Sequence, residues 1–513
     1  MVINDIKLKI GESEKRLYEI ACEQLGYKPS YFRILKKSLD ARKKNDIRYV
    51  YSIEFGEEIF EPKSLEKIER NKIPNEPILV VGSGPCGLFC ALRLIERGFT
   101  PIVIERGKSV DEREKSCSKF FTTASLDTES NIQFGEGGAG TFSDGKLNTQ
   151  THSPLIKKVL AEFVKFGAPE EIEYLSKPHI GSDNLKIVVK NMRRYIEQSG
   201  GKVLFGTKLI GFSQSGGKIV SVKVATKHGE SEIKVSALVL AIGHSARDTY
   251  KLLYDNGVTM RAKDFAVGVR IEHLQSEVGY SQYGSEYKKL PTADYKGVYN
   301  GKDRSAFTFC MCPGGEVVPS ASEENTVVTN GMSNYARNLD NANSALVVQV
   351  RRADYEKGSP LDGIDFQRAI EQKAFISGGG DYRAPITLVA DFIKGQNSKN
   401  LGSVSPTYAL GTKFARPETY LPPFITDTLR LAIPDIAKRL RFFASPDAVI
   451  TGAETRTSSP VKIERSESGT ALGFTNLYPG GEGAGYSGGI TSSAVDGIKI
   501  ADLIFNAVNQ NEW

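Results

Sequence analysis

Hydrophobic and polar positions along the first part of the chain follow the pattern of a small α+β unit. Residues 2–10 alternate polar and apolar side chains, which predicts a half-exposed strand. A helical pattern with one apolar face follows and ends at Gly26. Two more alternating stretches, 31–38 and 47–55, predict a pair of strands. We therefore expect a small N-terminal domain over residues 1–75.

A second pattern begins after the proline-containing segment 72–77, which predicts a linker. Residues 78–81 are a continuous apolar run, typical of a central parallel strand, and lead directly into the glycine turn 82–87. A helical pattern then connects to a second strand, 101–104, which ends at Glu105. Strand, GxGxxG turn, helix, strand and acidic residue stand in the order of a dinucleotide-binding βαβ unit.

Each glycine of this turn has its own predicted role. Gly82 permits the tight turn, Gly84 lets the backbone approach a pyrophosphate, and Gly87 lets helix and strand pack closely. The helix N-terminus presents free N–H groups to the phosphates. Glu105 is expected to accept hydrogen bonds from ribose hydroxyls.

The remaining patterns predict a mixed α/β protein. Helices are expected at 154–166 and 187–197, and short strands at 203–205, 208–212, 218–226 and 232–235, forming a β-meander before the buried strand 237–242. Residues 261–429 mix strands, aromatic residues and long loops and carry no second dinucleotide turn. Residues 430–513 return to helix, strand, glycine loop and helix.

Two further glycine clusters indicate which cofactor the βαβ unit serves. Five glycines fall within positions 135–145 and six within 479–489. Glycine at this density costs folding entropy and is retained where bare backbone must approach a flat or charged ligand. The second cluster leads into a helical pattern from Ile490, so a helix N-terminus points at the ligand. A flavin fits, because its pyrimidine edge becomes anionic on reduction. A pair of mobile loops is the alternative explanation for both clusters.

These motifs resemble the FAD-dependent oxidoreductases with a glutathione-reductase-type fold and, more narrowly, a bacterial family of uncharacterised FAD-dependent dehydrogenases. The resemblance extends over nearly everything after residue 77. The strings that carry it are GEGGAGTFSDGKL (135–147), GHSARD (243–248), FAVGVRIEH (265–273), CMCPGGEVVPSASE (310–323), TNGMS (329–333), ETRTSSPV (454–461) and NLYPGGEGAGYSGGI (476–490). The resemblance implies a Rossmann-like FAD-binding domain in two parts, 76–260 and 430–513, a mixed α+β substrate domain over 261–429, and the N-terminal part as an accessory domain.

From the glycine motifs and this resemblance we expect a defined set of residues to hold FAD. They are Gly82, Ser83, Gly84, Pro85, Cys86, Gly87, Glu105, Arg106, Gly138, Gly140, Thr141, Ser143, Lys146, Leu209, Ala241, Gly243, Gly481, Glu482, Gly488, Gly489 and Ile490. Cys86 and Cys90 lie four residues apart on the first helix and are expected to be small buried residues facing the sheet.

Candidates for direct action in catalysis are Lys146, Cys310, Cys312 and Arg456. Residues two apart in a strand face the same side, so both thiols of Cys310 and Cys312 could reach the flavin and pass electrons. The alternative is that they are packing residues, because a disulfide with one spacer residue is strained. Arg456 is predicted, with Ser458, to bind an anionic substrate or the flavin pyrimidine edge.

Further polar residues are more easily explained by structure than by catalysis. Arg270 and Glu272 share one face of a predicted strand that also carries His273, which favours an ion pair between them. His244 follows the strand end at Ala241–Gly243 and is expected to cap a loop.

Composition narrows the function classes. Lys and Arg exceed Asp and Glu by 67 − 61 = 6, too few in 513 residues for a protein that coats nucleic acid. Six cysteines do not make a disulfide framework, and with five histidines we expect no metal site. No apolar run approaches the roughly 20 residues of a membrane span, and the N-terminus lacks a signal peptide pattern, so we expect a cytoplasmic protein.

The chain is therefore predicted to be an FAD-dependent oxidoreductase that transfers a hydride or electrons between an organic substrate and a carrier such as NAD(P)H. Two alternatives remain. One is a flavoprotein acting in RNA modification that docks through the basic residues 33–48; the other is a flavin-binding interaction protein without catalysis. The sequence determines neither the substrate nor the oligomeric state.

Overall fold

A computed structural model describes residues 1–57 and 74–510; the predicted linker at 72–77 begins outside the described residues. The N-terminal unit is a three-stranded antiparallel sheet in the order β1-β3-β2 with one helix packed on it. Its elements are β1 (Val2–Lys9), α1 (Lys15–Leu25), β2 (Tyr31–Asp40) and β3 (Arg48–Gly56). Leu17 and Ala21 of α1 are buried against Ile53 and Phe55 of β3 in a small separate core.

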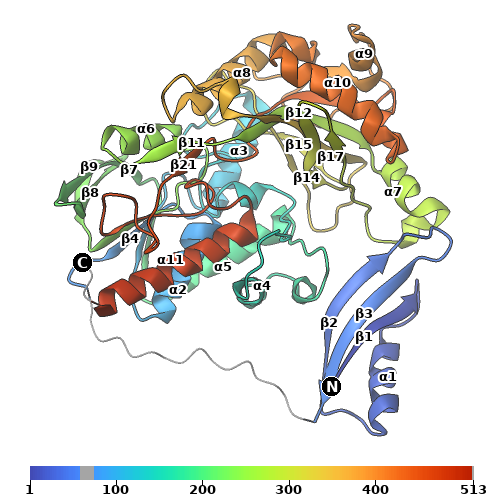
Figure 1. The fold of residues 1–513 in the computed structure, drawn as a ribbon, viewed down its shortest axis with the longest axis horizontal. Helices are drawn as coiled ribbons and strands as arrows, with labels where there is room; N and C mark the ends of the chain where they lie inside the picture. The colour runs from blue at the N-terminus through green and yellow to red at the C-terminus, as the bar shows by residue number, and fades with distance from the viewer. Residues whose placement is uncertain (58–73, 511–513) are drawn as a thin grey trace.

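This unit lies at one end of the molecule and contacts the rest through the edge of β2 (Figure 1). The amide of Lys37 donates to the carbonyl of Tyr174 at 2.8 Å, and the amide of Ser176 donates to the carbonyl of Lys37 at 2.9 Å. Part of the free edge of β2 is thereby covered.

A five-stranded parallel sheet forms the centre of the nucleotide-binding part, in the order β22-β10-β4-β5-β6. The strands are β4 (Ile78–Val81), β5 (Ile102–Ile104), β6 (Lys202–Leu204), β10 (Ala237–Leu240) and β22 (Leu477–Pro479). β4 and β10 are buried along their whole length, as continuous apolar runs require. β6 was predicted within the meander, but it pairs with β5 in this parallel sheet instead.

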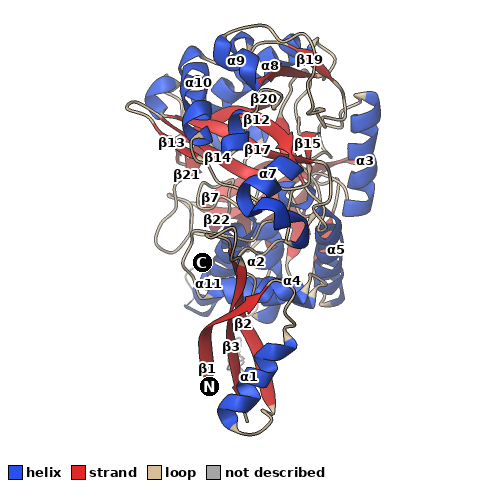
Figure 2. Ribbon diagram, turned by 90° about the vertical axis from the view of Figure 1, so that its right-hand side faces the viewer, coloured by secondary structure: helices blue, strands red, loops and turns tan. Residues whose placement is uncertain are grey.

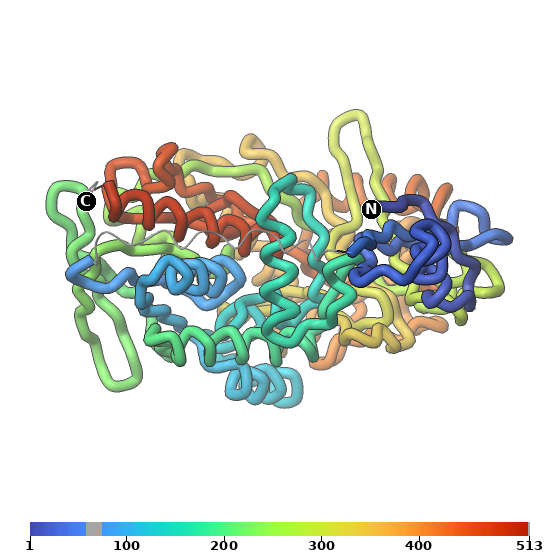
Figure 3. Tube along the Cα trace, turned by 90° about the horizontal axis from the view of Figure 1, so that it is seen from below, coloured from blue at the N-terminus to red at the C-terminus, as the bar shows by residue number. Residues whose placement is uncertain are grey.

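Helices α2 (Pro85–Glu96) and α11 (Ile490–Gln510) lie side by side on this sheet (Figure 3). Their contact is close because Gly497 has no side chain: a Cβ there would lie 2.1 Å from the carbonyl oxygen of Cys86. α4 (Leu155–Lys165) and α5 (Ser182–Gln198) extend the same apolar core.

An antiparallel meander packs on the parallel sheet through a second apolar core that includes Leu79, Leu209 and Val222. It consists of β7 (Lys208–Ser215), β8 (Lys218–Thr226) and β9 (Gly229–Lys234). Around it lie α6 (Arg247–Asp255) and the two-stranded pair β11 (Met260–Ala262) and β21 (Val461–Ile463).

A seven-stranded sheet, β13-β14-β17-β12-β20-β18-β19, forms the other large part. Its strands are β12 (Phe265–Leu274), β13 (Val298–Asn300), β14 (Ser305–Cys312), β17 (Asn341–Val350), β18 (Ala384–Leu388), β19 (Thr412–Phe414) and β20 (Val449–Glu454). Helices α8 (Asp362–Gly378), α9 (Val389–Lys394) and α10 (Pro423–Ala437) lie over this sheet, at the end of the molecule opposite the N-terminal unit (Figure 2).

The remaining α-helices and strands of the described residues border these sheets. They are α3 (Val110–Thr123), α7 (Gln275–Tyr283), β15 (Glu316–Pro319) and β16 (Thr329–Met332). No helix among residues 1–57 and 74–510 has the length and apolar character to cross a membrane.

Residues 430–454 do not follow the predicted division of the chain. We expected the second FAD-binding part to begin at residue 430. Instead, the second half of α10 packs on the seven-stranded sheet, and β20 is an internal strand of that sheet, paired with β12 and β18. The chain returns to the nucleotide-binding side only after β20, because the apolar pattern of a buried strand does not reveal which sheet it joins.

Candidate cofactor and active site

A cavity of about 360 Å³ lies where the nucleotide-binding part meets the seven-stranded sheet. All three glycine stretches of the sequence line it. Of the residues predicted to hold the cofactor, those lining it are Gly82, Gly84, Pro85, Cys86, Glu105, Arg106, Gly138, Gly140, Ser143, Lys146, Leu209, Ala241, Gly243, Gly481, Glu482, Gly488, Gly489 and Ile490. Ser83, Gly87 and Thr141 lie behind this wall and do not line the cavity.

The glycines of the first turn are required for different reasons. Gly82 has a φ of +102°, and a Cβ there would lie 2.2 Å from the carbonyl oxygen of Ala241. A Cβ on Gly87 would lie 1.9 Å from the carbonyl oxygen of Gly82, so this glycine sets the helix–strand contact. A Cβ on Gly84 would meet only the Cα of Gly138, at 3.7 Å, an ordinary contact. Packing therefore explains Gly82 and Gly87 but not Gly84, which lines the cavity.

Gly488 and Gly489, just before α11, have no structural reason to be glycine. Neither has a positive φ, and a Cβ on either would meet no atom of the described chain within 4 Å. Both line the cavity at the N-terminus of the helix. A ligand that lies against bare backbone accounts for them, so these residues fit a flat cofactor.

The carboxylate of Glu105 ties two of the glycine stretches together. One oxygen accepts hydrogen bonds from the amide and hydroxyl of Ser83, at 3.0 and 2.9 Å. The other accepts from the amides of Gly107 and Gly135, at 2.9 and 3.0 Å. Because both oxygens already accept two hydrogen bonds, the structure gives Glu105 a positioning role; its contact with a ribose stays a prediction.

Arg113 is a structural residue of the site that the sequence did not reveal. Its guanidinium is completely buried and donates to the carbonyls of Asn131, Ile132, Glu136 and Gly138 at 2.7–2.9 Å. It thereby fixes the glycine loop that lines the cavity. In the sequence, the one indication that Arg113 has this structural role is its place on the face of a helix that is buried.

Arg106 is held at the edge of the cavity by two carboxylates. It pairs with Glu129 at 2.7 Å and with Asp248 at 2.8 Å, and its guanidinium lies 4.2 Å from the centre of the Phe134 ring. Although burial alone would raise the pKa of Asp248, its hydrogen bond to Arg106 holds that pKa below its ordinary value.

A second part of the lining, called here the polar wall, comes from the seven-stranded sheet, from β16 and from the segment after β20. Its lining residues include Phe309, Cys310, Asn330, Glu454, Arg456 and Thr457. Asn330 and Glu454 lie within the strings TNGMS and ETRTSSPV, but sequence reasoning did not select them.

Arg270 forms a buried ion pair, although not with the predicted partner. Its guanidinium contacts both carboxylate oxygens of Glu454, and one nitrogen also donates to Asn343 at 2.7 Å. Glu272 instead accepts hydrogen bonds from Thr407 and Asn341, and burial raises its pKa. The predicted Arg270–Glu272 pair is therefore wrong. Residues that share a strand face need not pair with each other, because here the neighbouring strand β20 brings the carboxylate of Glu454 to the guanidinium of Arg270.

Cys310 and Cys312 lie at a β-bulge, where the register between β14 and β17 shifts after Phe309. Cys310 has a φ of +42°, unusual for a residue with a side chain, and lines the cavity. Cys312 is completely buried and does not line it. The predicted common face is wrong, because the bulge breaks the two-residue alternation.

Lys146 reaches across the cavity wall and donates to the carbonyl of Met311, between the two cysteines. Arg270 donates to the carbonyl of Cys310 at 3.1 Å. The bulge is thus held by two cations, Lys146 from the glycine loop and Arg270 from β12 of the same sheet.

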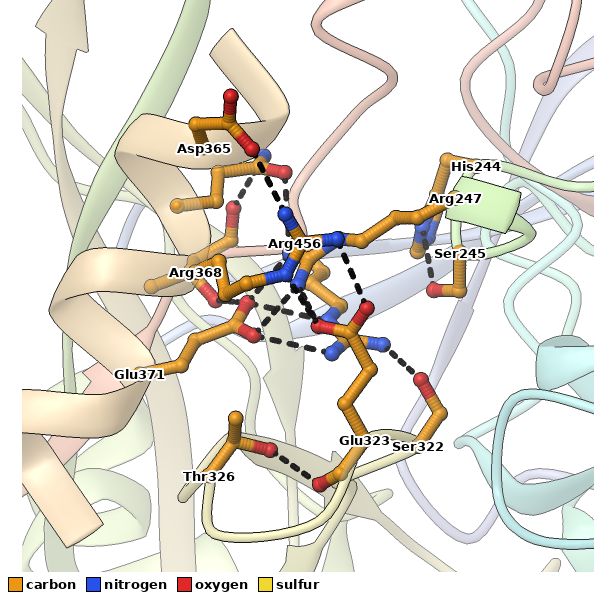
Figure 4. A network of polar contacts seen from close by, with 12 residues as sticks. His244, Ser245, Arg247, Ser322, Glu323, Thr326, Asp365, Arg368, Glu371 and Arg456 are labelled. Carbon is orange, nitrogen blue, oxygen red and sulfur yellow. Dashed lines mark hydrogen bonds and ion pairs between the residues drawn. The ribbon is translucent and has the colours of Figure 1, made fainter. Parts of the chain in front are cut away.

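Arg456 belongs to a network of charged residues beside the cavity (Figure 4). Arg456 and Arg247 both pair with the fully buried carboxylate of Glu371, at 3.0 and 2.8 Å. Arg247 also pairs with Glu323 at 2.6 Å, and Glu323 pairs with Arg368 at 2.9 Å. The two arginines hold the pKa of Glu371 below its ordinary value against the effect of burial. Ser458 does not line the cavity.

His244 lines the cavity and takes part in a chain of hydrogen bonds. Nε2 of Gln133 donates to the hydroxyl of Ser320 at 2.5 Å, so its Oε1 accepts from the hydroxyl of Ser245 at 3.0 Å. Ser245 then accepts from Nδ1 of His244 at 2.9 Å. This tautomer leaves Nε2 as an acceptor. Burial, together with Arg456 and Arg247, lowers the pKa of His244 to about 3, so the ring is neutral.

Glu482 lines the cavity beside Gly481, where burial raises the pKa of its carboxyl to about 7.

Cys86 and Cys90 are buried, and burial raises the pKa of both thiols. Cys86 belongs to the core that contains Val80 of the sheet, and a Cβ added at Gly481 would lie 2.8 Å from the Cβ of Cys86, so Cys86 also packs under the loop at Gly481.

Four of the seven basic residues within 33–48 pair with carboxylates of the same unit, one of them Arg33 with Glu54 at 2.7 Å. Arg42 pairs with Asp40 at 2.6 Å, Arg48 with Asp46 at 2.7 Å, and Lys37 with Glu14 at 2.6 Å. Docking of a nucleic acid through residues 33–48 stays a prediction. No group of three or more metal-binding side chains occurs among residues 1–57 and 74–510.

Comparisons with known proteins show which family the chain resembles. Residues 264–457 match the family described as "FAD-dependent protein, C-terminal domain-like", and residues 1–56 match a domain of unknown function. A protein of Clostridium beijerinckii described as "Uncharacterized protein" is 46% identical, covering 98% of both chains.

Solved flavoproteins are more distant. CtdE in complex with FAD is 10% identical with a TM-score of 0.37, covering 86% of this chain and 87% of its own. A flavoprotein/dehydrogenase from Cytophaga hutchinsonii is 11% identical with a TM-score of 0.39, covering 85% and 79%. A geranylgeranyl bacteriochlorophyll reductase-like protein from Thermoplasma acidophilum is 11% identical with a TM-score of 0.38, covering 85% and 79%.

Proposed function

We propose that this chain, which belongs to a family of FAD-dependent proteins, transfers a hydride or an electron pair between a small organic substrate and a carrier such as NAD(P)H. The family match confirms the predicted cofactor, FAD, and the prediction of a flavin-dependent oxidoreductase. The substrate, the carrier and the residues in contact with FAD belong to the proposal.

One observation carries it: bare glycines of the nucleotide-binding part and polar side chains of the seven-stranded sheet line the same cavity. The glycines that packing does not explain, Gly84, Gly488 and Gly489, all face the cavity. This combination suits a flat cofactor that lies against backbone on one side and leaves the other side to a reacting molecule.

We assign the phosphates of FAD to the N-terminus of α2 and the flavin ring to the N-terminus of α11. Both helices begin at the cavity wall, at Pro85 and Ile490, and a helix N-terminus stabilises a nearby negative charge by about 0.3–2 kcal/mol. Bound FAD supplies the two-electron chemistry, because its isoalloxazine accepts and releases a hydride. The protein supplies position and charge, and we infer that the parallel sheet and meander form a glutathione-reductase-type FAD-binding unit.

The polar wall is assigned to the substrate. Arg456 is held by Glu371 and lines the cavity, and a guanidinium there favours an anionic or strongly polar substrate group. His244 is neutral with Nε2 as acceptor, so it can bind a hydroxyl or amine of the substrate. Lys146 places a positive charge beside the same space.

Anaerobic reduction tests this proposal. The purified protein with bound FAD is mixed with NADH or NADPH without oxygen, and flavin absorbance is followed in a stopped-flow instrument. We expect one of the two to bleach the flavin within seconds, after which candidate organic oxidants are screened for reoxidation. A flavin that stays oxidised with both carriers would contradict the proposed carrier and favour a non-catalytic role.

A further inference from the structure

We propose that Cys310 and Cys312 form a redox-active dithiol pair that exchanges two electrons with the flavin. This inference rests on the proposed position of FAD in the cavity. It adds a redox site to the oxidoreductase function, and neither the family match nor the relative assigns one there.

The bulge brings the two thiols together. In a regular strand, residues two apart are separated by about 6.6 Å along the backbone, near the upper limit for a disulfide. At this bulge the thiol of Cys312 turns back toward Cys310, lying 3.5 Å from its carbonyl oxygen and in hydrogen-bond contact with its thiol. Both cysteines are free thiols in the structure.

The two thiols have different surroundings, as an exchanging pair requires. Cys310 lines the cavity, whereas Cys312 is completely buried behind it. Space for Cys312 exists because residue 331 is glycine: a Cβ there would lie 2.8 Å from its sulfur and 2.3 Å from Nη1 of Arg270. One thiol is thus exposed to a reaction partner and the other is protected as the resolving thiol.

Charged groups around the bulge favour a thiolate at Cys310. The hydrogen bond from Cys312 lowers the pKa of the Cys310 thiol, and the positive charges of Arg270 and Lys146 act in the same direction, against burial and the negative charge of Glu454. The interaction with Cys310 raises the pKa of Cys312, and burial adds to that effect. The pair therefore holds one proton, on Cys312.

The electron balance follows from this arrangement. When the S–S bond of an oxidised Cys310–Cys312 pair breaks, the two sulfurs take two electrons from the reduced cofactor FADH⁻. Cys310 becomes a thiolate, and Cys312 takes the one proton that is released as FADH⁻ returns to FAD. In the reverse direction the dithiol delivers the same two electrons and one proton to FAD. The pair therefore stores the equivalent of one hydride in addition to the one that the flavin can hold.

Counting electrons and thiols tests the pair without the substrate. The holoprotein is titrated anaerobically with dithionite, and flavin absorbance gives the electrons consumed per FAD. We expect the wild type to take up two electrons more per FAD than Cys310→Ser or Cys312→Ser. The control variant Cys22→Ser, altered in the N-terminal unit, should behave as the wild type.

Thiols are counted in parallel after unfolding in denaturant. Air-oxidised wild type should present two fewer reactive thiols than its six cysteines, and all six after reduction. Equal electron uptake in wild type and variants, with six thiols in the air-oxidised protein, would overturn the proposal. Because dithionite requires no carrier, and the thiol count requires no flavin, this result is separable from a failure of reduction by NADH or NADPH. If a variant fails to bind FAD, the wild-type thiol count decides.

Discussion

The buried guanidinium of Arg270 makes a two-point ion pair with the carboxylate of Glu454, with nitrogen–oxygen distances of 3.0 and 2.8 Å. The two residues are 184 positions apart in the sequence and lie on neighbouring strands, β12 and β20. Glu454 lines the cavity, and Arg270 also contacts the bulge at Cys310. This pair thus connects the polar wall of the cavity to the interior of the seven-stranded sheet.

Replacing Glu454 by Gln should destabilise the protein strongly. The change leaves the charge of Arg270 buried without its counter-ion, which costs about 3–5 kcal/mol of unfolding free energy. Urea unfolding measures the difference. The matched control is Glu356→Gln, which removes an exposed pair with Arg352 and should cost about 1 kcal/mol or less. A loss of less than about 1 kcal/mol for Glu454→Gln would mean that the pair does not hold this wall.

Replacing Gly489 by Ala should weaken FAD binding without weakening the fold. A methyl group there meets no described protein atom within 4 Å but enters the cavity, so we expect FAD affinity to fall about tenfold or more, a loss of about 1.4 kcal/mol. The unfolding free energy of the apoprotein should stay within about 0.5 kcal/mol of the wild type.

Gly82→Ala provides the contrast, because a methyl group there collides with the carbonyl of Ala241 and the φ of +102° disfavours any side chain. This variant should lower the stability of the apoprotein itself. Fluorescence titration with FAD and thermal unfolding measure the two effects. If Gly489→Ala bound FAD as tightly as the wild type, its position at the cofactor would be refuted.

The carboxyl of Glu482 should make apoprotein stability depend on pH. Its pKa is about 7 in the folded chain, above the ordinary value of 4.5, so between these values the folded state binds more protons than the unfolded state. Unfolding free energy therefore falls as the pH rises from 5 to 8. Urea unfolding at several pH values should show a steeper decline in the wild type than in Glu482→Gln. Parallel curves for the two proteins would show that this carboxyl does not titrate in that range.

The thiol of Cys310 should react with iodoacetamide at lower pH than an ordinary thiol. The thiolate is the reactive form, and Cys312, Arg270 and Lys146 favour it, whereas Glu454 and burial oppose it. The alkylation rate of Cys310 in the apoprotein, followed by peptide mass spectrometry, should rise through a midpoint well below pH 9. Lys146→Gln should move that midpoint upward. A midpoint at or above pH 9 in the wild type would contradict the assigned environment.

Sequence patterns were sufficient for the nucleotide-binding side because its features are local. The turn at residues 82–87 follows a buried strand and precedes a helix, so the role of each glycine can be predicted from its position in the turn. The glycine clusters at 135–145 and 479–489 could be assigned to one ligand because both stand beside helices or strands of the same unit. The family match confirms the resemblance to FAD-dependent proteins that these motifs indicated.

The polar wall could not be predicted, because it depends on contacts between distant segments. Strand alternation placed Arg270 beside Glu272, but only the pairing of β12 with β20 brings Glu454 to it. The bulge at Cys310 is held by Arg270 and by Lys146, which lies 165 residues away in the chain. For the same reason the network of Arg247, Glu371 and Arg456 was not visible in the sequence, although Arg456 had been selected.

An experimental structure of the protein with FAD bound is the most direct test of the account. We predict that the pyrophosphate lies at Gly84 and the N-terminus of α2, and that the flavin ring lies between the 138–146 loop and Gly488–Gly489, with Cys310 on its open side. FAD bound elsewhere, with this cavity empty, would contradict the account.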